Sequence, residues 1–562
     1  MRTLLAIAFS LLVLVPAWAE DPKPAVPMPP VTSRSELVLV PTMVRDKSGA
    51  VVSGLSKGDF ILLENGAEQK IAVFEEIRTS AIRPSHPPLP TGEFSNYLVR
   101  EPGSQRITII VMDAINTQFA DRAYAREQIL KFLAEVAGSR DPIALLLLQR
   151  SGARVIHDFT TDSTVLAKAL RRLQPGDGAP VADNEETLPS PTTSNLALSN
   201  ENAQIASEIQ QLVQMLDNME QNYLASQRMM AALLTLDCMQ QIARAYAAIP
   251  GRKSLIWASG GFPFSIDDLS RLVSGSSAAV PSYLSDILPR YENTWRALNA
   301  ANIALYPVDV HGMVMALPGA ERHISATGLK SAGQRISITH LDTLDTFRQF
   351  AEMTGGKAYF NTNDLVHAFR DAVDDSAAYY ILGFYVAPED RKPGWRKLQV
   401  KVQHPGAQVR NRSGFYMMPE DKDKNKTKLN EIALALSSPV DFTSLPVLAR
   451  WTGTTPNGDK KRAAFELILP ANAALVDEAD QNHLSLEFQA AASLTTGKAI
   501  ASNGRSVEAH LKPEALAQVR SAGVTYKGVL ELPPGEYNVR FVVRDNLSGR
   551  LGSLAAPLQI GP

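Results

Sequence analysis

Continuous apolar runs recur between residues 105 and 375, and segments with helical periodicity separate them. The first helical segment places Ala125, Ile129, Phe132 and Val136 on one face. Strands that are apolar on both faces and alternate with helices are typical of a largely parallel sheet covered on both sides. The pattern therefore predicts an α/β fold with a doubly wound, mostly parallel sheet. The runs lie at 107–112, 143–148, 255–258, 303–308 and 357–360.

Strand signals dominate on both sides of this segment. In the N-terminal part, Asn65-Gly66 lies between two β-rich runs, which is a strong hairpin signal. After residue 430 strands recur without helices, and turn residues separate them, which predicts an Ig-like β-sandwich. The strands at 377–386 and 398–402 fit two alternatives: they extend the α/β sheet, or they join the N-terminal β-unit.

These patterns divide the chain into a series of expected parts. In order, they are a signal peptide at 1–19, a linker at 20–35, a small N-terminal β-unit at 36–80, a linker at 81–104, the α/β domain at 105–375 with insertions near 175–222 and 311–340, a β-extension at 376–418, a charged linker at 419–429 and the β-sandwich at 430–562.

Residues 1–19 have the composition of a secretory signal peptide. Arg2 supplies the positive start, 3–15 form an apolar run, and Ala17-Trp18-Ala19 is a small-x-small cleavage signal. The apolar run is shorter than the roughly 20 residues that a helix needs to span a bilayer. We therefore expect an exported protein, periplasmic or extracellular, with no transmembrane segment after signal cleavage.

The charge balance limits the classes of partner, and the cysteine content limits how the fold can be stabilised. The chain has 56 Lys and Arg against 58 Asp and Glu, a balance that argues against a nucleic-acid partner bound by bulk charge. Cys238 is the only cysteine, so an intramolecular disulfide is impossible, and its apolar helical surroundings predict a buried thiol. A group of methionines at helical spacing is expected in the core. They are Met215, Met219, Met229, Met230 and Met239.

Several short motifs occur in the order seen in a known family. They are VVSGL at 51–55, DAINT at 113–117, PGRKSLIW at 250–257, SGGF at 259–262, YPVD at 306–309 and YYILGF at 379–384. Through these motifs, residues 36–418 resemble the VWFA-related family of bacterial secreted proteins, first defined in acidobacteria. The resemblance implies a von Willebrand factor type A-like domain.

The resemblance also implies where a divalent cation would bind. Type A domains hold it with a D-x-S-x-S motif, a distal Thr and a second Asp. Here Asp113 and Thr117 match ligand positions, whereas Ile115 and Ser259 replace a Ser and an Asp. The implied site is degenerate, and we expect Mg²⁺ or Ca²⁺ to bind weakly or not at all. From the residues alone, we favour Asp113, Asn116 and Thr117 as caps of the following helix.

Loops that follow parallel strands emerge at one edge of a sheet, where ligands bind. The candidate binding residues there are Asp113, Asn116, Thr117, Ser259, Phe262, Phe264 and Asp309. Phe262 and Phe264 either offer apolar anchors or pack under the insertion. Asp309 either faces the same crevice or caps a turn, and His311 is expected as a solvated loop residue.

The sequence shows no catalytic set, because it has neither H-E-x-x-H nor G-x-S-x-G, and Ser259 has no assignable base. We therefore expect an exported, non-enzymatic protein of the protein-binding or adhesion type, with an unidentified protein partner. The alternatives are an envelope enzyme or enzyme accessory working at 254–261 or 309–311, and a structural subunit of an extracellular assembly.

The signal peptide gives the first testable prediction. Because Ala17-Trp18-Ala19 follows the apolar run, the mature protein is expected to begin at Glu20. N-terminal sequencing of the protein from culture fractions checks this. A mature chain that starts at Met1 would contradict it.

Overall fold

The computed structural model describes most of the chain between residues 36 and 561. The described residues are 36–78, 90, 92–96, 106–139, 141–173, 203–247, 249, 251–262, 282–311, 344–387, 392–417, 424–478, 480–494 and 498–561. The expected signal peptide 1–19, the linker 20–35, Phe264 and the insertion residues 174–202 and 312–343 lie outside them.

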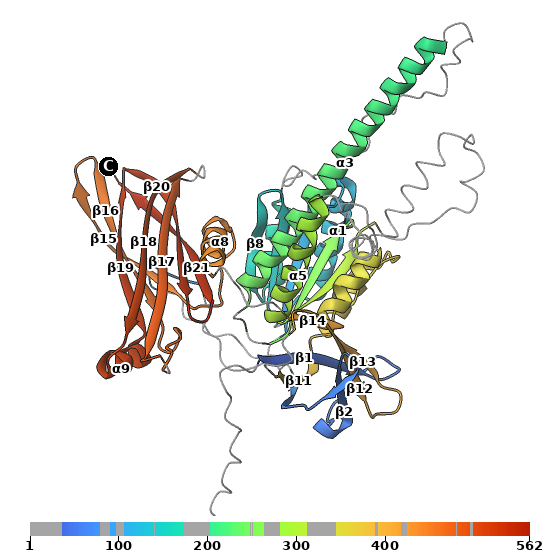
Figure 1. Cartoon of the computed structure of the whole chain (residues 1–562), viewed down its shortest axis with the longest axis horizontal. Coiled ribbons are helices and arrows are strands. Elements are labelled where there is room, and N and C mark those ends of the chain that lie inside the picture. Colours follow the sequence, from blue (N-terminus) through green and yellow to red (C-terminus); the bar gives the residue numbers. More distant parts are fainter. Residues whose placement is uncertain are drawn as a thin grey trace, which may run out of the picture.

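A five-stranded mixed sheet lies at the centre of the molecule (Figure 1). In spatial order its strands are β10 Ile303–Asp309, β9 Lys253–Ser259, β6 Ile107–Asp113, β7 Ile143–Gln149 and β8 Gly152–Thr160. The first four run parallel, and β8 pairs antiparallel with β7. Every residue of β6, β9 and β10 is buried, which explains why these strands are apolar on both faces.

Helices cover both faces of the mixed sheet. On one face lie α1 Phe119–Glu135, α2 Ser163–Arg171 and α7 Leu365–Asp374, and on the other lie α3 Ala203–Ala245 and α5 Ser282–Ala300. The second face holds the larger aromatic side chains, with Trp257 packed against Phe347 and Phe350. Among the residues that the structure describes, no helix combines the length and hydrophobicity needed to cross a membrane.

A small sandwich of two four-stranded antiparallel sheets packs below the mixed sheet in Figure 1. The strands of the first sheet are, in spatial order, β13 Gln408–Asn411, β1 Glu36–Arg45, β11 Ala378–Val386 and β4 Val73–Arg78. Those of the second sheet are β14 Gly414–Met417, β12 Gly394–Val402, β2 Phe60–Glu64 and β3 Ala67–Gln69. The short helix η1 Lys57–Asp59 precedes β2. Asn65 and Gly66 both take positive φ between β2 and β3, so the predicted hairpin is present.

Both ends of the central segment return to this sandwich. Strand β11 pairs on one side with β1 and on the other with β4, where Ala378 lies opposite Arg78. Of the two alternatives that the sequence left open, the strands after residue 376 therefore join the N-terminal β-unit. The helix-covered segment is inserted between β4 and β11.

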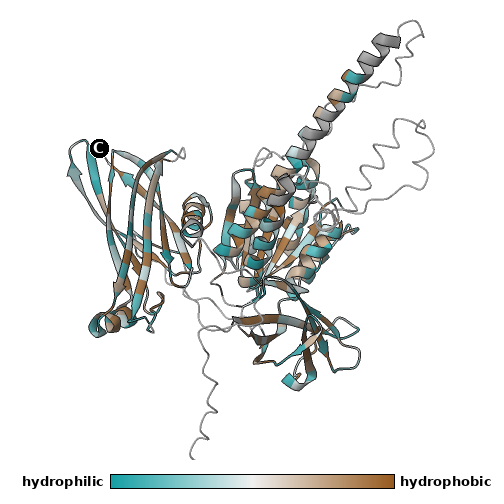
Figure 2. Ribbon diagram, viewed as in Figure 1, coloured by the Kyte–Doolittle hydropathy of each residue, from teal (hydrophilic) through white to brown (hydrophobic). Residues whose placement is uncertain are grey.

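The C-terminal part is a second sandwich of two antiparallel sheets. The strands of one sheet are, in spatial order, β19 Val524–Leu532, β16 Lys460–Leu469, β15 Leu448–Asn457 and β5 Glu93–Ser95. Those of the other sheet are β18 Ala499–His510, β17 His483–Leu494, β20 Gly535–Asp545 and β21 Leu551–Ile560. Helix α9 Pro513–Ala522 precedes β19. Figure 2 shows hydrophobic and hydrophilic residues interspersed along these strands, and along β16 buried positions alternate with more exposed ones.

Two features join this sandwich to the rest of the chain. Strand β5 comes from the expected linker 81–104, and the side chain of Asn96, directly after it, bonds to the backbone of Phe442, Leu445 and Val447 at 2.6–2.9 Å. Phe442 also belongs to the core between α3 and the mixed sheet. The segment 81–104 is therefore partly a strand and ties the two units together.

A helix replaces part of the expected charged linker. α8 Lys424–Ser437 covers the proposed boundary at 429–430 and packs on β20. Ile432 and Ala435 are buried at helical spacing, and this short apolar stripe holds the charged segment as a helix. The expectation that no helix of any length occurs after residue 430 is also wrong, because α9 has 10 residues.

The expected fold class is wrong. Four of the five sheets in the described part of the chain are antiparallel throughout, so the protein is mostly β and is not a doubly wound α/β protein. Parallel pairing is confined to the one mixed sheet. The prediction assigned too large a share of the fold to this sheet, because fully buried strands form conspicuous apolar runs in the sequence. Antiparallel strands with one exposed face do not form such runs.

A buried carboxylate holds the mixed sheet and the first sandwich together. Asp375, with a side chain only 4% exposed, accepts a hydrogen bond from the Tyr306 hydroxyl at 2.5 Å and pairs with Arg45 at 3.1 Å. Arg410 pairs with the same carboxylate, and Arg252 donates to the Tyr306 oxygen at 3.2 Å. Burial alone would raise the pKa of Asp375, but Arg410, Arg252 and the other donors outweigh it and hold the pKa below its usual range.

This cluster predicts a pH-dependent loss of stability. Asp375→Asn leaves the buried Arg252 and the partly exposed Arg45 and Arg410 without their counter-charge, so at pH 7 it should lower the free energy of unfolding by about 3 kcal/mol, the lower end for a broken buried pair. Because the folded pKa is depressed, the stabilisation is present above the unfolded value of 3.8 and is lost as the pH falls through the folded pKa. Urea unfolding at several pH values measures the difference between the two proteins, which should shrink in acid.

Asp374→Asn is the matched control for this experiment. Asp374 pairs with Arg106 through a side chain that is 55% exposed, so its loss should change stability by less than about 1 kcal/mol. Equal destabilisation by both variants would contradict the role given to Asp375.

Candidate functional site

Three polar residues end neighbouring strands of the mixed sheet. Asp113 closes β6, Ser259 closes β9 and Asp309 closes β10. Asp309 lies opposite Ser259 in the parallel register, and Met112 lies opposite Ala258 one residue earlier. The strand ends therefore bring all three side chains to one edge of the sheet, as the sequence predicts.

The Asp113 carboxylate is fully buried and accepts five hydrogen bonds. Oδ1 accepts from the backbone N–H groups of Ile115 and Asn116 at 2.8 and 3.0 Å. Oδ2 accepts from Asn116 Nδ2 at 2.8 Å, Trp257 Nε1 at 3.1 Å and Ser259 Oγ at 2.7 Å. Burial raises the pKa of Asp113, and the hydrogen bonds from Asn116 and Ser259 oppose that rise.

This arrangement does not fit a divalent cation. A carboxylate has about four lone-pair sites, and five donors already occupy the two oxygens of Asp113. The Thr117 hydroxyl accepts from the Gly260 N–H at 2.9 Å, and Ile115 contributes no side-chain oxygen. Within the described ranges, no three His, Cys, Asp or Glu side chains are grouped as a metal site requires.

Asp113, Asn116 and Thr117 do not cap the following helix, so that expectation is wrong. The N-cap residue of α1 is Gln118, and it makes no side-chain capping bond. Asp113 instead closes the turn at Ile115 and Asn116, and Thr117 fastens this turn to the loop after β9. The three residues act on the strand-end loops because Gln118 separates them from the first turn of the helix.

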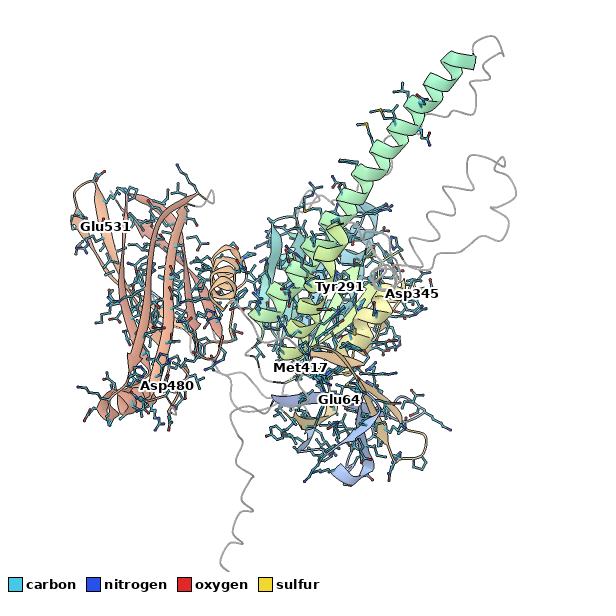
Figure 3. The ribbon with its side chains drawn as sticks, in the orientation of Figure 1. Glu64, Tyr291, Asp345, Met417, Asp480 and Glu531 are labelled. Carbon is cyan, nitrogen blue, oxygen red and sulfur yellow. The ribbon has the colours of Figure 1, made fainter. Side chains whose placement is uncertain are left out.

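Phe262 is a core residue and cannot serve as an exposed anchor. It is 2% exposed, and its ring lies 5.3 Å from that of Phe350 and 5.9 Å from that of Tyr291, which Figure 3 labels on α5. The apolar-anchor alternative is therefore wrong for this residue, and the side chains that cover it in the described part of the chain include those of Phe350 and Tyr291; the insertion expected above it lies outside the described residues. Phe264 lies outside the described residues.

A second cluster lies beside the Asp113 turn. Asp309 Oδ1 accepts from the backbone N–H of His311 at 3.0 Å and bonds to its ring Nδ1 at 2.8 Å. His311 Nε2 faces Oδ2 of Asp121, in the first turn of α1, at 3.6 Å. We call Asp309, His311 and Asp121 the acidic cluster.

Burial differs across the acidic cluster. The Asp309 side chain is fully buried, whereas the side chains of His311 and Asp121 are 33% and 25% exposed. Asp309 Oδ2 is buried and has no hydrogen-bond partner among the described atoms. The bond to Asp309 and the charges of both carboxylates raise the pKa of His311 above 6.5, against an opposing effect of burial. His311 is thus a fixed part of the cluster and not the solvated loop residue that was expected.

The two clusters share one loop junction. A Cβ atom at Gly260 would lie 2.9 Å from the Asn116 carbonyl oxygen and 3.3 Å from His311 Cε1. Only glycine therefore lets the loops after β6, β9 and β10 approach so closely. Sequence reasoning missed Asp121, because an Asp in the first turn of a helix is common and carries no signal of its own.

Comparisons with known proteins assign no family. No protein-family model matches the chain, and no curated protein sequence matches it. Among solved structures, the pilus adhesin SpaC from Lactobacillus rhamnosus GG, in an open conformation, is similar at 8% identity with a TM-score of 0.27. The similarity covers 92% of this chain and 58% of the adhesin, so the chain spans a little over half of that protein's length. A TM-score this low does not establish a shared fold.

The occupied carboxylate of Asp113 predicts that cations find no site there. Calorimetric titration with Mg²⁺, Ca²⁺ and Mn²⁺ is expected to show no micromolar binding, because a ligand role for Asp113 would first break its hydrogen bonds. A micromolar site that Asp113→Ala abolishes and Asp121→Asn leaves intact would contradict this prediction.

Proposed function

We propose that the chain is an exported, non-enzymatic protein-binding protein, and that its acidic cluster receives a Lys or Arg side chain of the partner protein. The observation that carries the proposal is the pair of carboxylates at the strand-end surface, with Asp309 buried behind His311 and Asp121 at the rim. Two acidic groups around one histidine favour the binding of a positively charged side chain.

The geometry gives each residue a separate task. Asp309 bonds to the imidazole through Nδ1, which directs Nε2 toward Asp121. When His311 is neutral, Nε2 is an acceptor and the ring places no positive charge beside Asp121. A charge-assisted hydrogen bond from an ammonium or guanidinium group to Asp121 would then be reinforced by the charge of Asp309.

The Asp309–His311 pair also supports a second candidate, an envelope hydrolase. A carboxylate bonded to Nδ1 is the arrangement that orients a histidine general base. Ser259, the nearest candidate nucleophile from the sequence, is held by Asp113 at 2.7 Å and by the Gly261 backbone, which does not suit an attacking hydroxyl. Binding is therefore the better-supported function.

The proposal predicts charge-selective, pH-dependent binding. Peptides that carry one Lys or Arg in an uncharged context should bind, and matched Gln peptides should not. Asp121→Asn should weaken binding by roughly 10-fold or more, the loss expected for one charged hydrogen bond. Affinity should rise as the pH increases through the raised pKa of His311, because the ring then loses the positive charge that repels the ligand. Fluorescence titration across this pH range measures both effects.

Asp480→Asn is the matched control, since Asp480 is an exposed carboxylate of the C-terminal sandwich that also lies beside a histidine, His483. Equal losses in both variants, or equal binding of Gln peptides, would contradict the proposal. Turnover of a hydrolase substrate panel that His311→Asn abolishes would replace it with the enzymatic candidate.

A further inference from the structure

Helix α3 has two halves with opposite environments. Its C-terminal half packs into the core, with Ala232, Leu236, Met239 and Ile242 completely buried. Its N-terminal half extends away from the body of the molecule (Figure 1). Large apolar side chains on this half are about half exposed. They are Leu212, Met215, Leu216, Met219 and Tyr223, at 57%, 60%, 49%, 59% and 48%. The expectation that Met215, Met219 and Met230 lie in the core is therefore wrong, because Met230 is also 53% exposed.

Four of these residues, Leu212, Leu216, Met219 and Tyr223, belong to a heptad repeat on the projecting half of the helix. Apolar residues alternate at spacings of four and three along the helix, which is the a and d pattern of a coiled coil. Positions a hold Ile209, Leu216, Tyr223 and Met230, and positions d hold Ile205, Leu212 and Met219, with the polar Ser226 as the one interruption before Leu233. We call this row the α3 seam.

The surroundings of the seam argue against a membrane surface. Residues 203–227 contain Glu208, Asp217 and Glu220 and no Lys or Arg. Helices that lie on anionic membranes carry a basic polar face, so this segment has the wrong sign of charge. A protein helix with the same kind of seam fits better.

We propose that the α3 seam pairs with the α3 seam of a second copy of this chain, in a parallel coiled coil. In a parallel pair, each g position faces the e position of the next heptad on the other helix. Glu208 and Met215 occupy g positions, and the e positions that follow them are Val213 and Glu220, so no g–e pair of this register holds two carboxylates. Self-pairing therefore brings no two carboxylates together at the flanks of the seam, and no basic partner is required there.

The area of the seam fits a small interface. Full burial of a Leu or Met side chain removes on the order of 100 Å² of apolar surface. The five half-exposed side chains of two copies therefore contribute about 500 Å², and the flanking side chains of the same turns must supply the rest of the about 1,000 Å² at which specific interfaces begin. A projecting helix without such packing would depend on its intrinsic propensity alone, which is marginal in water.

The test is the oligomeric state of the full mature chain, measured by sedimentation velocity over a wide range of protein concentrations. The wild-type protein is expected to form a dimer. Leu216→Glu places a charge at an a position of both copies and should raise the dissociation constant on the order of 100-fold or more. Gln214→Glu adds the same charge at an exposed f position and should leave the dimer unchanged.

Oxidative crosslinking tests the parallel orientation. Met219→Cys brings two d positions face to face only in a parallel pair, so a disulfide-linked dimer is expected, whereas Gln214→Cys should give none. The native Cys238 is buried and does not compete. A monomer at all concentrations would overturn the proposal and leave the seam to another segment or protein. A dimer that Leu216→Glu does not weaken would overturn it too. The melting temperature of each variant verifies that the body is folded.

Discussion

One buried anion, the carboxylate of Asp375, connects the mixed sheet to the first sandwich. It accepts a hydrogen bond from Tyr306 of the mixed sheet and pairs with two arginines of the first sandwich, Arg45 and Arg410. A charge at this depth is tolerated only because cations and a hydroxyl surround it. Electrostatic matching at Asp375 is therefore one of the contacts between sheet and sandwich, alongside the hydrogen bond from the Arg252 N–H to the Tyr379 hydroxyl at 2.9 Å.

The opposite end of the mixed sheet uses its carboxylates differently. Asp113 accepts hydrogen bonds from neutral donors only, and these bonds stiffen the turn after β6. Asp309 binds only His311 and leaves one oxygen without a donor among the described atoms. One edge of the sheet thus combines Asp113, whose carboxylate oxygens all have hydrogen-bond donors and hold the loops in place, with Asp309, which has one carboxylate oxygen without a donor among the described atoms. That contrast favours recognition of a cationic group at the rim over cation binding at the strand end.

Sequence reasoning located the parts whose signal is local. The strands β6, β7 and β10 were predicted to within one residue at each end and β9 to within two, because complete burial makes them almost continuously apolar. The fifth predicted run, 357–360, is wrong as a strand, since Tyr359 forms only an isolated bridge with Val308. The mostly β character, α8 and the origin of β5 were missed, since pairing between distant segments leaves no local pattern. At the site, Asp113, Ser259 and Asp309 were grouped correctly from strand ends, whereas the burial of Phe262 and the approach of Asp121 depend on packing that spacing does not encode. The methionines of α3 show the converse error, because helical spacing describes a face without saying what covers it.

The insertion of the central segment between β4 and β11 has a consequence for biosynthesis. Strand β1 is made early, yet its partner β11 follows only after the whole mixed sheet has been synthesised. At ordinary elongation rates that interval is on the order of tens of seconds. Throughout it, the apolar positions of β1 and β2 lack the strands that will bury them. The first sandwich is thus the earliest part to be translated and among the last to be completed, so the nascent chain is expected to need protection from aggregation over residues 36–78.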